Sequence, residues 1–221
     1  MFWVAIFPVN RNAKLIGLMR KVHRMVGSMQ LRHRMTLYNQ LYLSTMLYCS
    51  DVWGDSLKQH QKDKLHTLQR NAILSITGVY PSTNNSKLLD LLGLLEINDE
   101  IEFRSQTTHM DSHERRQKRA ELIAEHVHQE PYGTSFRCRL GESIGREVFC
   151  FLTGHGPFVS HSRRFDHPLP ENCRFCGLFV ETADHLLLHC AAFGRFTIDH
   201  DTETSAIESR CKLILSEIRK L

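Results

Sequence analysis

Residues Cys173 to Cys190 of this 221-residue chain read CRFCGLFVETADHLLLHC, and this segment is the strongest indication of how the C-terminal part folds. Its cysteines and histidine follow the pattern C-x2-C-x8-H-x4-C, formed by Cys173, Cys176, His185 and Cys190. Two thiolates at this spacing can bind one ion from a single tight turn, and Gly177 supplies the positive φ that such a turn often needs. Three thiolates and one imidazole make a closed tetrahedral shell, so we predict a structural Zn²⁺ site.

The residues after the turn predict how the other two ligands are presented. Thr182 is a plausible N-cap, which favours a short helix from Ala183 to His189 that carries His185. His189 is a competing ligand, but it adjoins Cys190 and should point to another side of the helix. The alternative is a set of ordinary buried cysteines and histidine. A catalytic zinc is disfavoured, because the chain lacks a glutamate in the deaminase arrangement H-x-E…P-C-x2-C.

The region before this stretch has the periodicity of helices. Apolar side chains recur at three- and four-residue steps from Met35 to Val52 and again from Leu65 to Ile76, where Gly78 is well placed to end the helix. A short apolar helix is expected at 87–92, before Gly93. Residues 98–135 are polar and charge-dense, as in an exposed helix or a hinge.

The C-terminal region adds two more helices to the prediction. One covers Ile144 to Leu152 and ends at Gly154, and an amphipathic helix runs from Ile207 to Leu221 and should pack on its own domain. We therefore expect a mainly α chain: a helical region at 1–100, a charged helix or linker at 101–135, and a small zinc-knuckle domain with a C-terminal amphipathic helix at 136–221.

The charge is unevenly distributed. The chain has 28 Lys and Arg against 24 Asp and Glu, a net charge of +4, yet residues 1–50 hold only basic charges. Such a basic end suggests a polyanionic partner, nucleic acid or a membrane surface, although a solvated helix face is the alternative. We expect phosphate contacts from five of these side chains: Arg20, Lys21, Arg24, Arg32 and Arg34. Cations and an aromatic also meet at the knuckle, where further contacts would come from Arg163, Arg164, Arg174 and Phe175. A basic surface with a locally packed Phe175 is the alternative there.

Other features of the sequence restrict the function. No apolar run is long enough to span a membrane, and the start lacks the features of a signal peptide, so we expect an intracellular protein in the nucleus and cytoplasm. No set of catalytic residues appears, so we expect no enzyme activity from this chain.

The cysteines outside the knuckle pattern divide into three that fit apolar helical patterns and one without an explanation. The three are Cys49, Cys150 and Cys211, and the fourth is Cys138. Three histidines, at 155, 161 and 167, could form a second metal site, although scattered surface histidines are the simpler interpretation.

Several motifs, in order, resemble one family. Three of these motifs precede the knuckle: the helix end Tyr48-x4-Trp53-Gly54, the stretch Leu68-Gln-Arg…Ile76-Thr-Gly-x-Tyr80 and the segment Thr153-Gly-His-Gly156. The knuckle itself continues with Glu181-Thr182, Phe193 and Arg195. This order is similar to the C-terminal part of the reverse transcriptase of non-LTR (LINE-type), jockey-like retrotransposons. The match covers about 35–100 and 150–196, and Leu95-Glu96 stands where the family usually has a proline.

The resemblance implies a thumb-like helical region and a zinc-binding tail that engages RNA or DNA, single-stranded or as primer–template. A retrotransposon ribonucleoprotein is the assembly in which this would occur. The polymerase palm and the endonuclease would precede residue 1, so a truncated or degenerate copy is expected. Two rivals stay open. One is a zinc-knuckle protein-interaction module without nucleic-acid function, and the other is part of an active polymerase whose palm lies upstream.

Overall fold

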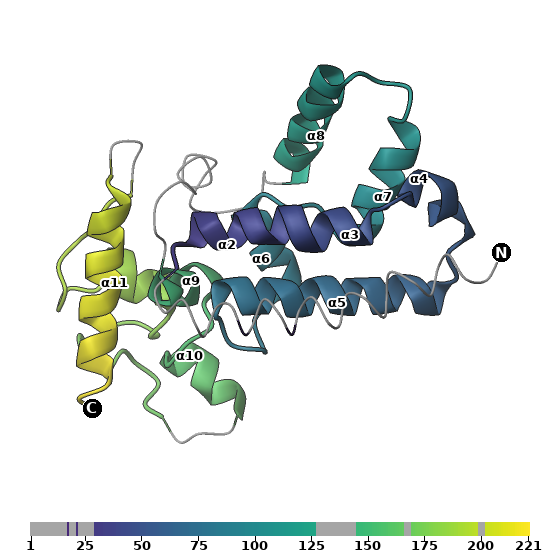
Figure 1. Cartoon of the computed structure of the whole chain (residues 1–221). Coiled ribbons are helices and arrows are strands. Elements are labelled where there is room, and N and C mark those ends of the chain that lie inside the picture. Colours follow the sequence, from purple (N-terminus) through teal and green to yellow (C-terminus); the bar gives the residue numbers. More distant parts are fainter. Residues whose placement is uncertain (1–16, 18–20, 22–28, 127–144, 166–168, 199–201) are drawn as a thin grey trace. The chain divides into compact units, whose positions relative to one another are not determined.

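The computed structural model describes residues 17, 21, 29–126, 145–165, 169–198 and 202–221. These residues are mainly helical, and no strand occurs among them. The helices are α2 (Leu31–Leu37), η1 (Tyr38–Leu43), α3 (Ser44–Met46), α4 (Ser50–Trp53), η2 (Gly54–Ser56), α5 (Gln59–Thr77), α6 (Asn85–Leu92), α7 (Ile97–Gln106), α8 (Ser112–His126), α9 (Arg146–Thr153), α10 (Val159–Ser162), η4 (Arg163–Phe165), η5 (His185–His189) and α11 (Thr204–Ile218). The prediction of a mainly α chain is confirmed (Figure 1).

The chain forms two compact units. The first contains residues 1–76 and 85–141, and the second contains 77–84 and 142–221. The segment at 101–135, which the sequence predicts to be a charged helix or linker, contains most of α7 and all of α8, and both helices belong to the first unit.

Glycines end the helices where the sequence predicts. Gly78 after α5, Gly93 after α6 and Gly154 after α9 have φ of 68°, 62° and 68°. Glycine adopts this left-handed conformation without the steric penalty of a Cβ atom, so the chain can turn away directly after the last helical residue. The conformation of Gly154 confirms the prediction that the helix before it ends there.

In the first unit, α2 and η1 lie alongside α5 (Figure 1), and a buried glutamine joins them. Gln69 of α5 has no exposed surface. Its Nε2 donates to the Tyr38 hydroxyl at 3.2 Å and to the Leu95 carbonyl at 2.9 Å, and its Oε1 accepts from the Ile97 backbone N–H at 2.8 Å. All of these hydrogen bonds are buried, so one side chain fixes α5 against both η1 and the start of α7.

The π-helix η1 changes which side chains face the core. An α-helical pattern through Val52 places Tyr48 and Val52 on the buried face, but their exposed fractions are 76% and 78%. The π-helix adds a residue to the turn, so the buried positions continue at four-residue steps through Tyr38, Tyr42 and Met46. The predicted face is therefore wrong beyond Met46.

Cys49 is also not a core residue. It is exposed and adopts a left-handed conformation, with φ 55° and ψ 31°, at the break between α3 and α4. The prediction that it packs in a helix core is wrong, because the helix ends before it. Cys150 and Cys211 are buried as predicted, and Cys138 lies outside the described residues.

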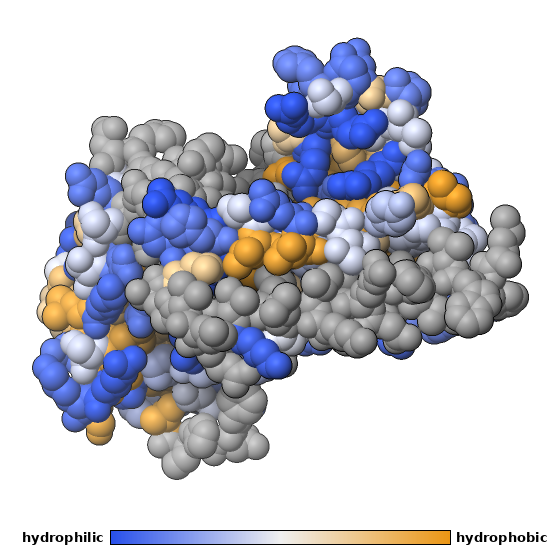
Figure 2. Space-filling view, viewed as in Figure 1, coloured by the Kyte–Doolittle hydropathy of each residue, from blue (hydrophilic) through white to orange (hydrophobic). Residues whose placement is uncertain are grey.

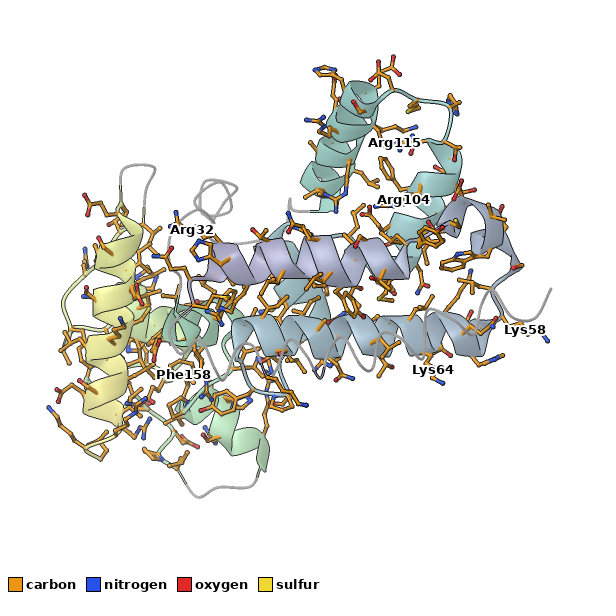
Figure 3. The ribbon with its side chains drawn as sticks, viewed as in Figure 1. Arg32, Lys58, Lys64, Arg104, Arg115 and Phe158 are labelled. Atoms are coloured by element: carbon orange, nitrogen blue, oxygen red, sulfur yellow. The ribbon has the colours of Figure 1, made fainter. Side chains whose placement is uncertain are left out.

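A buried carboxylate connects α7 to α8. Glu100 is 4% exposed, and its Oε2 lies 3.0 Å from Arg119 Nη2 on α8. Arg115 of α8 reaches back to the end of α7, where its Nη2 donates to the Thr107 carbonyl at 3.0 Å (Figure 3). The outer surface of α8 is mostly hydrophilic (Figure 2), in agreement with its few apolar residues.

In the second unit, α9 and α11 pack against each other. The buried face of α11 contains Ile207, Cys211, Ile214 and Ile218, which are the positions of the predicted amphipathic pattern, whereas Leu221 is 71% exposed. Packing of this helix on its own unit is therefore confirmed.

Candidate metal centre

A tight turn presents the first two cysteines. The Gly177 backbone N–H donates to the Cys173 carbonyl at 2.9 Å, and Gly177 has φ 70°, as the sequence predicts. The Cys173 N–H donates to the Phe179 carbonyl at 2.6 Å, which closes the loop behind the turn. Cys173 is thereby 3% exposed, while Cys176 is half-buried.

A capped turn of helix presents the other two ligands. Thr182 Oγ1 accepts a hydrogen bond from the His185 N–H at 3.0 Å, which confirms Thr182 as the cap. Residues His185–His189 form a π-helix, and the Cys190 N–H donates to the His185 carbonyl at 2.7 Å.

This π-helix explains how side chains five residues apart face the same ion. In an α-helix, positions five apart differ by roughly 140° around the axis, so they would point in different directions. A turn closed by a hydrogen bond five residues back returns the chain close to the same face. His185 and Cys190 therefore converge, whereas His189 is exposed. The spacing alone gives no indication of this π-turn.

The four predicted ligands form one cluster. The ligand atoms of Cys173, Cys176, His185 and Cys190 all lie within 4.8 Å of one another. Cys173 Sγ lies 3.9 Å from Cys190 Sγ, and Cys176 Sγ lies 3.2 Å from His185 Nε2. Zinc–sulfur bonds of about 2.3 Å in a tetrahedron put two sulfurs about 3.8 Å apart. The cluster can hold a metal ion, and its donor set and dimensions are compatible with zinc.

The electrostatics of the ligands differ with their surroundings. Burial raises the pKa of the Cys173 thiol from 9.0 to about 11, and it lowers the pKa of the His185 imidazole. The backbone N–H of Leu178 is the main cause of a lowered pKa at the Cys176 thiol. A neutral imidazole is ready to bind a cation, whereas the Cys173 thiol must lose its proton to become a ligand.

Glu181 and Arg174 connect the parts of the loop that surrounds the cluster through hydrogen bonds and an ion pair. Glu181 has no exposed surface, and it accepts hydrogen bonds from the Arg174 Nε at 3.0 Å and from the Arg174 backbone N–H at 3.0 Å. The Val159 N–H also donates to Glu181 Oε1 at 3.3 Å, and Arg174 Nη2 donates to the Pro157 carbonyl at 2.9 Å. Arg174, which we expected to contact nucleic acid, thus makes an internal ion pair. The sequence shows both residues, but only the fold shows that they meet.

Arg210 of α11 binds the segment on either side of Cys190. Its guanidinium donates to the carbonyls of Leu187 at 2.7 Å, Phe193 at 3.0 Å and Gly194 at 2.6 Å. It also lies 4.8 Å from the centre of the Phe196 ring. These contacts tie the C-terminal helix to the last ligand. Sequence reasoning missed Arg210, because nothing in its local pattern distinguishes it from a solvated arginine.

The other residues expected to bind nucleic acid occupy varied positions. Lys21, Arg32, Arg163 and Arg164 are exposed, and Arg34 is half-buried and donates to the Ile76 carbonyl. Arg20 and Arg24 lie outside the described residues. In Figure 3, Arg32 of α2 and Lys64 of α5 project from opposite sides of the two helices. Phe175 packs edge-on against Phe193, with ring centres 4.9 Å apart, so its ring is engaged within the knuckle.

Two of the three histidines considered for a second metal site lie close together. The ring centres of His155 and His161 are 4.8 Å apart, and each Nδ1 contacts a backbone carbonyl, of Thr153 and Gly156 respectively. His167 lies outside the described residues. Among the described residues, the Cys173–Cys190 cluster is the one group of at least three metal-ligating side chains.

Comparison of the chain with protein-family models, with curated proteins and with solved structures finds no match. Among the described helices, none has the length and hydropathy that a membrane span requires.

Proposed function

We propose that the chain is a non-catalytic nucleic-acid-binding protein whose C-terminal unit contains a structural zinc knuckle. The four-ligand cluster of Cys173, Cys176, His185 and Cys190 carries this proposal, since four soft and borderline ligands in a closed shell favour Zn²⁺. The same knuckle pattern underlies the resemblance to the C-terminal part of a non-LTR retrotransposon reverse transcriptase, of which this chain would be a fragment without palm or endonuclease.

The distribution of charge supports a nucleic-acid partner. Arg163 and Arg164 are exposed in η4, which directly follows α10. The Ser160 N–H donates to the Glu181 carbonyl at 3.1 Å, so the start of α10 is attached to the knuckle loop. Two exposed guanidiniums on an element attached to the knuckle loop are suited to phosphate oxygens.

The zinc part of the proposal is tested by the mass of the native protein. Native mass spectrometry of metal-replete protein should show one zinc per chain, and Cys190→Ala should remove it. His189→Gln is the matched control, because His189 is exposed and lies beside the cluster without joining it. Purified protein that takes up no zinc would contradict the proposal.

The nucleic-acid part is tested by a salt titration against a labelled single-stranded RNA. Each phosphate neutralised contributes about 0.7 to the slope of log K against log salt for a single strand. The double variant Arg163→Gln/Arg164→Gln should therefore weaken binding and reduce the slope by about 1.4. The control, Arg116→Gln/Lys118→Gln, removes the same charge from the exposed surface of α8. Absence of binding at low salt, or equal effects of both pairs, would refute these contacts.

A second candidate function has its own supporting observation. Leu178, Phe179 and Val180 are consecutive apolar residues on the knuckle loop, with exposed fractions of 66%, 64% and 50%. Contiguous exposed apolar side chains often mark a protein-interaction site. Phe179→Asp would abolish self-association or partner binding in a protein-interaction module, whereas salt-dependent RNA binding through Arg163 and Arg164 would remain.

A further inference from the structure

The first unit contains a cavity of about 330 Å³ at the break between α3 and α4. Tyr48, Cys49 and Ser50 border it from the break, Arg104 borders it from α7, and Arg115 borders it from α8. Pockets that bind small ligands have volumes of about 300–1,000 Å³, so the cavity is large enough for one. None of these residues belongs to the metal cluster.

Two buried donors at this cavity have no acceptor in the described part of the chain. Ser50 is 1% exposed, and its Oγ makes no hydrogen bond there. Arg115 Nε is buried and also lacks an acceptor, although Nη2 of the same guanidinium donates to the carbonyls of Thr107 and Met110. Buried polar groups are nearly always hydrogen-bonded, so two such donors beside one cavity point to an acceptor that a ligand supplies.

The charges around the cavity favour an anion. Arg104 and Arg115 contribute two positive charges, and Asp51 at the border contributes one negative charge. Arg104 Nε lies 3.5 Å from Glu100 Oε1, but Glu100 is also neutralised by Arg119 at 3.0 Å. A guanidinium matches the geometry of phosphate oxygens, a hydroxyl can donate to them as well, and a phosphate has enough oxygens to accept from all three side chains.

An aromatic side chain stands at the edge of the same cavity. Tyr48 is 76% exposed, and its backbone carbonyl is held by Trp53 Nε1 at 2.8 Å, which fixes the backbone under the exposed ring. An exposed ring on a fixed backbone is a stacking platform for a base. We propose that the cavity binds a nucleotide, whose phosphate accepts hydrogen bonds from Ser50, Arg104 and Arg115 while its base stacks on Tyr48. This site goes beyond the proposed function, since it needs neither the zinc knuckle nor a long strand.

Cys49 provides a reporter for this binding, because this free cysteine is exposed and borders the cavity. The rate of Cys49 alkylation by iodoacetamide, read from the Cys49 peptide by mass spectrometry, is measured in the full chain with adenosine 5′-monophosphate. The nucleotide should slow alkylation in a saturable way, and adenosine without phosphate should not. Absence of protection by the nucleotide, or equal protection by adenosine, would overturn the proposal.

Variants test the predicted contacts. Ser50→Ala and Arg104→Gln should each raise the nucleotide concentration for half-protection about tenfold, the effect of losing one hydrogen bond to a charged group. Arg116→Gln, which removes an exposed charge outside the cavity, should leave it unchanged. Ser50→Ala should also keep the thermal stability of the protein, because the lost hydroxyl has no partner among the described residues. A Ser50→Ala protein with unchanged half-protection would overturn the assignment.

The source of the phosphate is distinguished by a short RNA with either a 5′-phosphate or a 5′-hydroxyl. Protection by the phosphorylated form but not by the hydroxyl form identifies a strand end as a ligand, and protection by the mononucleotide alone identifies a free nucleotide. Both results support a nucleotide site. RNA binding in the salt titration without any protection of Cys49 overturns the cavity site and leaves the proposed function standing.

Discussion

The two units are stabilised in different ways. In the first, the long helix α5 and the shorter α6 and α7 bury apolar side chains such as Ile73, Leu88 and Ile101, with buried polar side chains such as Gln69 between them. In the second, α9 and α11 form a similar apolar contact, but residues 169–198 consist of turns and one short helix. In that segment the four candidate ligands lie in one cluster, Glu181 pairs with Arg174, and Arg210 contacts the carbonyls around Cys190.

The apolar first unit and the segment at 169–198 of the second unit should differ in the interactions that they need in order to fold. Apolar burial is spread over many side chains, so a helical unit loses stability gradually as single contacts are removed. A short loop with little apolar surface depends on a few strong interactions. The first unit should therefore fold without metal, and the knuckle should not.

The largest expected effect is that of metal removal. Structural zinc sites contribute about 10–16 kcal/mol of apparent binding free energy, more than the whole stability of most small domains. Chelation should abolish amide hydrogen-exchange protection in residues 173–190 while α5, at 59–77, keeps its protection. Equal protection of both segments after chelation would remove the contrast between the units.

Loss of the buried carboxylate in the knuckle should have the next largest effect. Glu181→Ala leaves the Arg174 guanidinium without its partner, and breaking a buried pair costs about 3–5 kcal/mol. Denaturant unfolding of the second unit measures this loss. Glu171→Ala is the control, since Glu171 is exposed in the same segment, and a loss of equal size there would show that general charge, not the pair, is responsible.

In the first unit, the matching experiment is Gln69→Leu. The variant leaves the Leu95 carbonyl and the Ile97 N–H without their buried partner, at a cost of about 3 kcal/mol in total. Denaturant unfolding followed by circular dichroism should show a lower free energy of unfolding. The control Gln59→Leu, on the exposed start of the same helix, should change the free energy of unfolding little. A Gln69→Leu protein with unchanged stability would mean that apolar packing alone fixes this unit.

The smallest expected effect comes from one close contact in the first unit. A Cβ atom at Gly54 would lie 2.5 Å from Ile101 Cγ2, so Gly54→Ala overpacks the contact between η2 and α7 and should cost about 2 kcal/mol. Ile101→Leu removes the branched methyl and should restore most of the melting temperature in the double variant. If the stability change of the double variant equalled the sum of the two single changes, the two positions would not be in contact.

Local rules explain most of what the sequence predicted correctly. The N-cap Thr182, the left-handed Gly78, Gly154 and Gly177, and the period of α11 all depend on interactions within a few residues along the chain. The burial of Tyr48, Val52 and Cys49 was predicted wrongly for the opposite reason. The π-helix η1 shifts the register of the first helix, the helix ends before Cys49, and no local propensity indicates either change.

Ligand spacing and helical period are properties of nearby positions, so the sequence alone predicted the four residues of the candidate metal cluster and the mainly helical class. The fold was needed to show that Arg174 pairs with Glu181, that Gln69 joins three segments, and that Ser50 and Arg115 border one cavity. The physical reason is that a polar side chain can satisfy its hydrogen bonds with water or with many partners. Its actual partner is fixed only when packing brings distant segments together and excludes the water.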